Sequence, residues 1–238
     1  MTHVAKRLLR TSVKPIGPAR YLYRGLVTAS SVFHGAVVFA KQALVATPAF
    51  LSLCEEYGDG ISVECLPYMP GGAIRIRLGN NIRISGLISI YATRGRNPLL
   101  EIGDGVFIGH HTSIAVASHV KIGNYVAIGS NTFITDTEGH NKQPGELRSA
   151  WDTPAVESDI APIVIEDGCW IGRNVAIFHG VRIGAGSVIG YGAVVRSNVP
   201  PGSMVVGNPG RPIPTKLFRQ DASAAGSKPP LTSRKAQK

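Results

Sequence analysis

The stretch IEDGCWIGRNVAIFHGVRIGAGSVIGYGAVV, residues 165–195, decides the fold of this chain. Every sixth residue in it is aliphatic, whereas an α-helix needs a spacing near 3.6 and a two-sided strand needs a period of two. A period of six suits a coil of short strands joined by tight corners, in which one aliphatic side chain per face points inward. The same period runs back through the chain, in five triplets: Leu78, Ile84, Ile90; Ile102, Ile108, Ile114; Ile122, Ile128, Ile134; Ile165, Ile171, Ile177; Ile183, Ile189, Val195.

These triplets predict an all-β fold, a parallel β-helix of about five or more coils whose stability comes from stacking. The repeat loses phase in three places. The interval from Ile90 to Ile102 has six extra residues, and the interval from Ile114 to Ile122 has two. The interval before Ile165 has 25 extra residues, which predicts a long loop over residues 136–160. An excursion of that length from a compact domain is usually functional.

The charge of the chain is concentrated at its two ends. The 238 residues carry 25 Lys and Arg against 15 Asp and Glu, a formal net charge of +10. Residues 1–54 hold seven basic residues and no acidic one, and residues 211–238 hold seven basic residues and one acidic one. The repeat body between them is therefore mildly acidic and shows no basic surface interleaved with aromatic residues. This distribution argues against a nucleic-acid partner.

Cysteine usage points to a reducing compartment. Cys54, Cys65 and Cys169 are odd in number and show no CxxC spacing. The pattern argues against a disulfide framework and against a thiolate zinc site. We therefore expect a cytoplasmic protein.

The sequence divides into three parts: a basic, partly helical segment over residues 1–60, the coil over 61–213, and a basic tail over 214–238 whose composition predicts disorder. Residues 20–54 are strongly apolar, but the uncharged stretch before Lys41 is near 16 residues, short of the ~20 that a spanning helix needs. Two alternatives stay open for residues 1–54. They form amphipathic helices that pack against the coil, or they make a peripheral contact with the inner membrane face.

The hexads, together with the C-terminal run VPPGSMVVGNPGRPI over residues 199–213, resemble the hexapeptide-repeat acyltransferases. The segments ITDTEGH, residues 134–140, and APIVIEDGCWIG, residues 161–172, are similar to the branch that acetylates sugar hydroxyls, such as maltose and galactoside acetyltransferases and surface-polysaccharide O-acetyltransferases. The resemblance implies a left-handed coil, acetyl-CoA as acyl donor, a homotrimer with active sites between adjacent coils, and a sugar or polysaccharide acceptor. It implies no metal.

Acetyl transfer to a hydroxyl needs a base, and histidine suits this role at neutral pH. His140 occupies the place of the family's catalytic histidine at the root of the loop. Asp136 or Glu138 is the carboxylate that would orient the imidazole, and simple loop solubility is the alternative for both. The family loop often carries an aromatic residue where Gly139 stands. We predict acceptor contacts by one corner residue and three loop residues: Asn131, Asn141, Arg148 and Trp151.

The resemblance also implies where the coenzyme would lie. Trp170 matches a tryptophan that borders the coenzyme channel, with an aromatic cover for the coil edge as the alternative. Backbone amides near Gly172, Gly192 and Ala193 are candidates for the pantetheine arm or the developing oxyanion. Candidate partners for the coenzyme phosphates are three basic residues, which otherwise form a solvated face: Arg196, Arg211 and Lys216.

Two other function classes compete with acetyl transfer. One is a non-catalytic β-helix scaffold at the membrane, and the other is a zinc enzyme like the γ-class carbonic anhydrases, which share this coil. The zinc enzymes need a histidine pair five residues apart, which this sequence lacks. Four corner histidines are interpreted as solvated side chains: His110, His111, His119 and His179.

Overall fold

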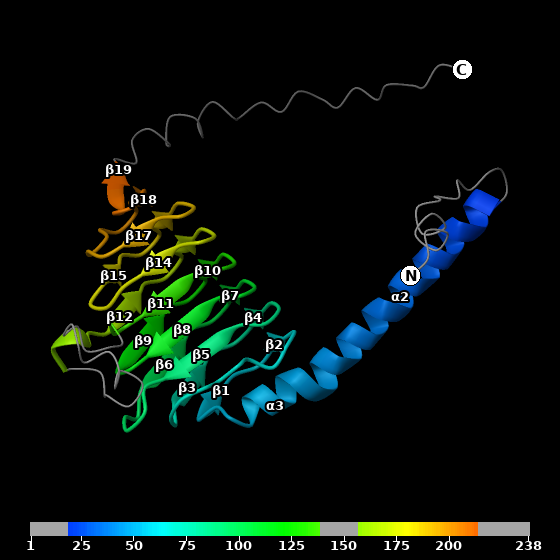
Figure 1. The fold of residues 1–238 in the computed structure, drawn as a ribbon, viewed down its shortest axis with the longest axis horizontal. Helices are drawn as coiled ribbons and strands as arrows, with labels where there is room; N and C mark the ends of the chain where they lie inside the picture. Colours follow the sequence, from blue (N-terminus) through cyan, green and yellow to red (C-terminus); the bar gives the residue numbers. More distant parts are fainter. Residues whose placement is uncertain (1–18, 139–156, 214–238) are drawn as a thin grey trace, which may run out of the picture. The chain divides into compact units, whose positions relative to one another are not determined.

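A computed structural model describes residues 19–138 and 157–213 of the chain. The chain divides into two compact units, Met1–Lys41 and Gln42–Lys238, and each is described by itself. The first unit contributes one described helix, α2 (Ala19–Lys41), and the second contains the coil (Figure 1).

The coil has three faces, and each face is a sheet of mainly parallel strands. The chain contributes strands in the order sheet A, sheet B, sheet C. Sheet A consists of β1 (Glu56–Tyr57), β3 (Arg75–Leu78), β6 (Leu99–Ile102), β9 (His119–Ile122), β12 (Ile163–Ile165) and β15 (Arg182–Ile183). Sheet B consists of β2 (Ser62–Val63), β4 (Arg83–Ile84), β7 (Phe107–Ile108), β10 (Ala127–Ile128), β13 (Trp170–Ile171), β16 (Val188–Ile189), β18 (Met204–Val206) and the antiparallel β19 (Arg211–Ile213). Sheet C consists of β5 (Ser89–Ala92), β8 (Ser113–Val116), β11 (Phe133–Thr135), β14 (Ala176–Ile177) and β17 (Val194–Val195).

The strand register follows the hexads of the sequence. Leu78 aligns with Ile102 on sheet A, and the later first-position residues continue that column. The second and third positions form equivalent columns on sheets B and C. Every one of the fifteen aliphatic side chains is buried, with at most 6% of its surface exposed. The predicted parallel β-helix is thereby confirmed, and its geometry is consistent with the left-handed coil that the resemblance implies.

Glycine is required where successive coils pass one another most closely. A Cβ built on Gly129 would lie 2.7 Å from the carbonyl carbon of Gly172 in the next coil. That neighbour is backbone and cannot rotate away, so the strand spacing itself would have to change. The glycines thus serve the stacking of the coil.

The N-terminal end of the coil is closed by residues that precede it. A five-residue π-helix (Gln42–Ala46) leads into α3 (Thr47–Leu51), whose Phe50 is fully buried in the hydrophobic core. Thr47 Oγ1 accepts a hydrogen bond of 3.0 Å from the Val63 amide, and Gln42 bonds to Ser62. These contacts fix the cap on the first coil. The coil begins at Glu56, slightly before the boundary at residue 61 that the hexads predict.

The described helical residues, 19–51, lie within the partly helical segment that the sequence predicts. One described helix, Arg20–Leu51, is long and apolar enough to be a candidate membrane span. The expectation from the sequence concerns a different quantity, the uncharged stretch between Arg24 and Lys41, which is near 16 residues. The criterion of length and composition also selects signal sequences and core helices, so it does not establish a span.

Candidate active site

The three breaks in the hexad phase open at one corner of the coil. Each break follows an aliphatic residue of sheet C and precedes one of sheet A: Ile90 before Ile102, Ile114 before Ile122, and Ile134 before Ile165. Figure 1 shows this corner between β11 and β12. We call it the insertion corner, defined by the described residues 93–98, 115–118, 136–138 and 157–162.

Asp136 ties the third insertion to the second. Its side chain is fully buried, and its carboxylate accepts backbone hydrogen bonds from Ala117 (2.6 Å), Ser118 (2.7 Å) and His119 (2.8 Å). Burial raises the pKa of Asp136 above its ordinary value, and the three amide donors act in the opposite direction. Since both oxygens are engaged in this way, the Asp136 carboxylate holds the corner together. Whether Asp136 also orients a catalytic imidazole stays a prediction, because His140 lies outside the described residues.

Two further contacts order the third insertion. Arg96 of the first insertion forms an ion pair with Glu157 of the third, at the start of the 3-10 helix Glu157–Asp159. Thr137 and Ile160 form an antiparallel bridge, so the two ends of the predicted loop lie side by side. The described root of the loop is therefore an ordered part of the coil.

Glu138 pairs with a histidine of the next coil. Its Oε1 lies 3.1 Å from His179 Nε2, and both side chains are about three-quarters buried, with 25% and 27% of their surface exposed. A carboxylate can only accept a hydrogen bond, so His179 Nε2 donates and Nδ1 is the basic nitrogen of the neutral ring. A second pair at this corner joins His119 Nε2 to Glu101 Oε2 at 2.7 Å.

Sequence reasoning missed both histidine pairs because it interpreted His119 and His179 as solvated corner residues. The position of each histidine in the sequence could have indicated its pair. His119 directly follows the two-residue insertion, and His179 stands two residues after Ile177, as Asp136 does after Ile134. Placing the hexad columns side by side would have brought His179 to the root of the loop.

Arg196 completes the cluster around Glu138. Its guanidinium carbon lies 4.1 Å from the centre of the Phe178 ring, and Nη1 lies 3.8 Å from Glu138 Oε1. Phe178 also meets Phe133 edge to face. Arg196 is thus positioned by an aromatic ring and a carboxylate, while 56% of its side chain stays exposed. Its predicted contact with a coenzyme phosphate stays a prediction.

The predicted amide donors are already paired. The N–H groups of Gly172, Gly192 and Ala193 donate to the carbonyls of Ile189 (2.7 Å), Arg173 (3.0 Å) and Gly190 (3.3 Å). Each amide has one hydrogen, so none of the three is free for an oxyanion. Contacts of backbone amides near these residues with the pantetheine arm or the oxyanion stay a prediction, and they would need amides other than these three.

The remaining described candidates lie elsewhere on the coil. Trp170 opens β13 on sheet B, opposite the insertion corner, and 61% of its surface is exposed. Asn131 has φ 60°, so it adopts the left-handed corner conformation that Asn tolerates. Arg211 lies on β19 and is exposed. The other candidates fall outside the described residues: His140, Asn141, Arg148, Trp151 and Lys216.

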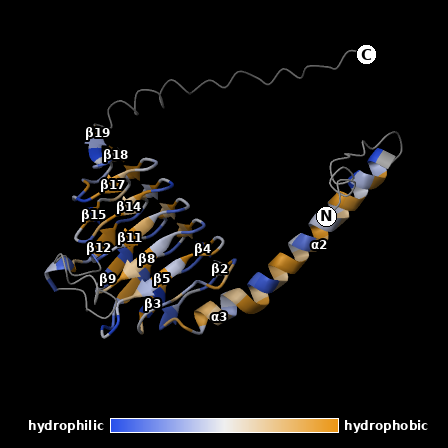
Figure 2. Cartoon of the chain, viewed as in Figure 1, coloured by the Kyte–Doolittle hydropathy of each residue, from blue (hydrophilic) through white to orange (hydrophobic). Residues whose placement is uncertain are grey.

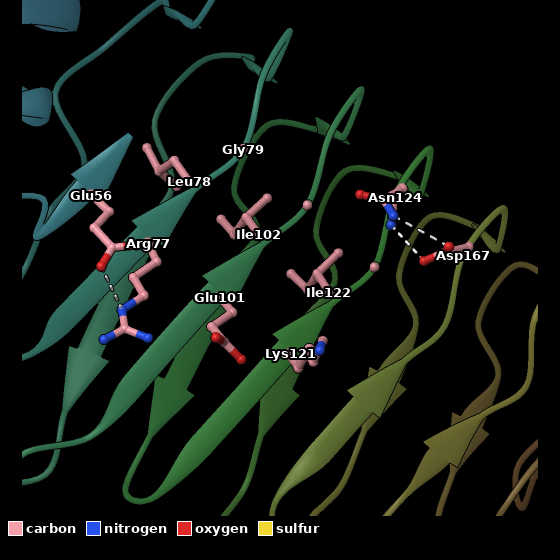
Figure 3. A pocket seen from close by; sticks show the side chains of 12 residues that line it. Glu56, Arg77, Leu78, Gly79, Glu101, Ile102, Lys121, Ile122, Asn124 and Asp167 are labelled. Carbon is pink, nitrogen blue, oxygen red and sulfur yellow. Dashed lines mark hydrogen bonds and ion pairs between the residues drawn. The ribbon is translucent and has the colours of Figure 1, made fainter. Parts of the chain in front are cut away.

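An open groove of about 540 Å³ runs along the outer surface of sheet A, and Figure 3 shows its charged side chains. Glu56, Arg77, Glu101 and Lys121 line it. A neighbouring hollow of about 390 Å³ shares Lys121 with it and continues along the same sheet. Glu101 connects the groove to the insertion corner, because its Oε2 holds His119. The lining of the groove has charged side chains of both signs, including the ion pair of Arg77 with Glu56, and no histidine. The insertion corner is therefore the better candidate for acid–base chemistry.

Metal ligands do not gather in the described part of the chain. Over residues 19–138 and 157–213, no group of three or more His, Cys, Asp or Glu side chains could hold a metal ion. The expectation of a metal-free enzyme is untested for the remaining residues.

Comparisons with known proteins agree with this architecture. Residues 162–197 match the family model described as bacterial transferase hexapeptide (six repeats). The chain is 30% identical to the galactoside O-acetyltransferase of Lactococcus lactis over 48% of its length, and 31% identical to Escherichia coli WbbJ, named for lipopolysaccharide O-acetyl transfer, over 51%. A Schizosaccharomyces pombe protein named as an acetyltransferase is 35% identical over 48% of the chain.

The chain spans only part of these relatives: 51% of the L. lactis protein, 61% of the E. coli protein and 52% of the S. pombe protein. Among solved structures, an N-acyltransferase of Bacillus cereus superimposes with a TM-score of 0.52 at 18% identity, over 71% of this chain and 89% of that one. That likeness shows the fold. Together the matches confirm the resemblance to hexapeptide-repeat acyltransferases that the sequence motifs predict.

Proposed function

We propose that this protein is an acyltransferase that moves an acetyl group from acetyl-CoA to a sugar hydroxyl, with His140 as the general base. One observation carries the proposal: the segment that contains His140 leaves the coil at the insertion corner, where all three departures from the hexad period meet. The relatives named as galactoside and lipopolysaccharide O-acetyltransferases favour a sugar acceptor and transfer to oxygen.

The chemistry follows from the poor nucleophilicity of an alcohol. His140 takes the acceptor hydroxyl proton as the oxygen attacks the thioester carbonyl carbon. The C–S bond then breaks, the acetyl ester remains on the sugar, and the proton on His140 passes to the leaving thiolate. Because the amides of Gly172, Gly192 and Ala193 are paired within the coil, we expect the oxyanion to be stabilised by other donors.

Glu138 is the better supported of the two carboxylates. It lies two residues before His140 in the sequence, and its Oε1 already accepts a hydrogen bond from His179. Asp136, in contrast, is fully buried beneath three amides. We propose that Glu138 and His179 hold the base of the loop in place and that Asp136 acts in folding.

A homotrimer is part of the proposal. Trp170 lies on sheet B, whereas the loop leaves the corner between sheets C and A, on the other side of the same coil. One copy therefore does not bring Trp170 and the loop root together, and a second copy packed beside it would. This geometry supports an active site shared between adjacent copies, with Trp170 bordering the coenzyme. We propose a cytoplasmic enzyme, since that compartment supplies acetyl-CoA, with a cell-surface polysaccharide or its precursor as acceptor.

The decisive experiment compares His140→Ala with His111→Asn. His111 is an exposed corner histidine with φ 56°, a conformation that Asn tolerates, so its replacement controls for loss of a surface imidazole. Acetyl-CoA is offered with a panel of monosaccharides and nucleotide sugars, and free thiol is measured. We expect His140→Ala to lose about 100-fold or more in rate and His111→Asn to match the wild type.

Retained turnover in His140→Ala would exclude this histidine as the base. If no acceptor releases thiol and acetyl-CoA causes no thermal shift, the chain is a non-catalytic scaffold. Stoichiometric zinc on elemental analysis together with CO2 hydration would support the zinc-enzyme alternative.

A further inference from the structure

Helix α2 has one apolar face and one polar, basic face. Leu22, Leu26 and Phe33 recur at the three- and four-residue spacing of a helical stripe, and their exposed fractions are 65%, 57% and 73%. The stripe is continued by Ala29, Ala36, Val37 and Ala40. The opposite face carries Arg20, Arg24, Thr28, Ser31, His34 and Lys41, interrupted by Val27 and Val38. Figure 2 shows apolar and polar residues alternating along α2.

The apolar face is not needed to close the coil. Phe50 and Ala46 close the coil, since both are buried. Thr47 also contributes, because its hydroxyl accepts a hydrogen bond from the backbone of the first coil. These residues lie after α2 and within the second unit. Of the two alternatives that the sequence leaves open for residues 1–54, capping is thus already provided by residues 42–51. Closing the coil therefore assigns no role to the apolar face of α2.

The charge of residues 1–54 favours an anionic lipid surface as the partner of the apolar face of α2. Residues 1–54 contain seven Lys and Arg and no Asp or Glu. A helix that packs on an ordinary protein surface usually carries both signs on its outer face, whereas a helix bound to anionic lipid is basic there. Each basic residue close to such a surface strengthens attraction to anionic headgroups.

Two hydroxyl groups of α2 donate hydrogen bonds within the helix. Thr28 Oγ1 donates to the Arg24 carbonyl at 2.9 Å, and Ser31 Oγ donates to the Val27 carbonyl at 2.8 Å. These bonds lower the cost of bringing both side chains near hydrocarbon, because neither hydroxyl needs a water partner.

We infer that α2 lies in the plane of an anionic membrane surface, with the stripe of Leu22, Leu26 and Phe33 in the acyl region and the basic face toward the headgroups. An in-plane position fits better than a spanning one. The uncharged residues between Arg24 and Lys41 cover about 24 Å of helix, against about 30 Å of hydrocarbon core. A span would also place His34 inside the bilayer. This inference goes beyond the proposed acetyl transfer and can be tested without any acceptor.

The test measures flotation of the full chain with two kinds of vesicle, phosphatidylcholine alone and phosphatidylcholine mixed with phosphatidylglycerol. We expect binding to the mixed vesicles that weakens as salt is added.

The double variant Leu26→Gln/Phe33→Gln should lose about tenfold or more in partition coefficient, because two large apolar side chains leave the stripe. The matched control Thr28→Gln/Ser31→Gln makes the same replacement on the polar face and should bind like the wild type. Arg20→Gln/Arg24→Gln should reduce the preference for phosphatidylglycerol by about fivefold per residue.

All variants should keep the thermal unfolding transition of the coil, since α2 lies outside the second unit. Equal vesicle binding by Leu26→Gln/Phe33→Gln and its control would overturn the inference. So would retention in the membrane after alkaline carbonate extraction, which indicates a spanning helix. Vesicle-independent association of the chain that Leu26→Gln/Phe33→Gln abolishes, with no flotation of the wild type, would show that a second copy covers the stripe.

Discussion

Two corners of the same coil use polar side chains differently. At the corner between sheets A and B the hexad period is unbroken, and a ladder of Asn80, Asp104, Asn124 and Asp167 accepts the backbone amides of successive coils at 2.6–2.9 Å. At the insertion corner the period is broken three times. Asp136 accepts backbone amides there too, but Glu138 and Arg96 pair with other side chains. The comparison teaches that an unbroken period uses its polar groups for stacking, whereas a broken period adds pairs between side chains.

The largest expected effect is a greater loss of stability on replacing Asp136 than on replacing a residue of the ladder. Asp136→Ala should lower the free energy of unfolding by about 3 kcal/mol or more, because three amides lose their acceptor in a buried position. Asp104→Ala should cost about 1 kcal/mol, since Asp104 lies at the solvent edge and water can replace it. Urea unfolding measures both.

If Asp136→Ala does not fold, Asp136→Asn keeps one acceptor oxygen and should fall between the wild type and the alanine variant. Equal losses for Asp136→Ala and Asp104→Ala would mean that the two corners do not differ in the way described.

The second expected effect is on activity. Glu138→Gln and His179→Asn should each slow acetyl transfer by about tenfold or more, since small misplacements of a catalytic group are costly. Their free energies of unfolding should change by less than about 1 kcal/mol, because the pair is partly exposed. Asn124→Ala should show the reverse, a loss of stability with unchanged transfer. Unchanged transfer in Glu138→Gln would remove Glu138 from the site.

The coil could be predicted from the sequence because a hexad repeat reports burial and register together. Each aliphatic position, from Leu78 to Val195, both fills the core and aligns with its neighbour one coil away. The hexad repeat did not predict the first coil, because Tyr57 occupies the position at which later coils have Leu or Ile. Its core contact comes instead from Phe50, which precedes the repeat.

The candidate site was less accessible to sequence reasoning. Glu138 and His179 are 41 residues apart, and their meeting depends on how many coils separate them. Whether the amides of Gly172 and Gly192 are free depends on hydrogen bonds that the residue types do not report, since a glycine at a corner and a glycine at an anion site look alike. The function of Asp136 likewise became visible only with its burial.

The pH dependence of stability tests the same buried carboxylate. Burial raises the folded-state pKa of Asp136 above its ordinary value of 3.8, so the folded protein holds this proton more tightly than the unfolded chain does. The contribution of Asp136 to stability should be greatest below about pH 4 and decline as the pH rises through the folded-state pKa. The measurement is the difference in unfolding free energy between wild type and Asp136→Asn across this range. A difference that grows with pH would show that the three amide donors outweigh burial.

The smallest expected effect concerns the ion pair between Arg96 and Glu157, which joins the first insertion to the third. Glu157 is 83% exposed, so solvent screens the pair, and a double-mutant cycle of Arg96→Ala and Glu157→Ala should give a coupling of about 0.2–1 kcal/mol that falls with added salt. The buried tie through Asp136 would then account for most of the cohesion of the insertion corner. A coupling above about 2 kcal/mol would instead show that the three insertions act as one cooperative unit. The difference in stability between the insertion corner and the ladder would then arise from the whole corner and not from the Asp136 carboxylate alone.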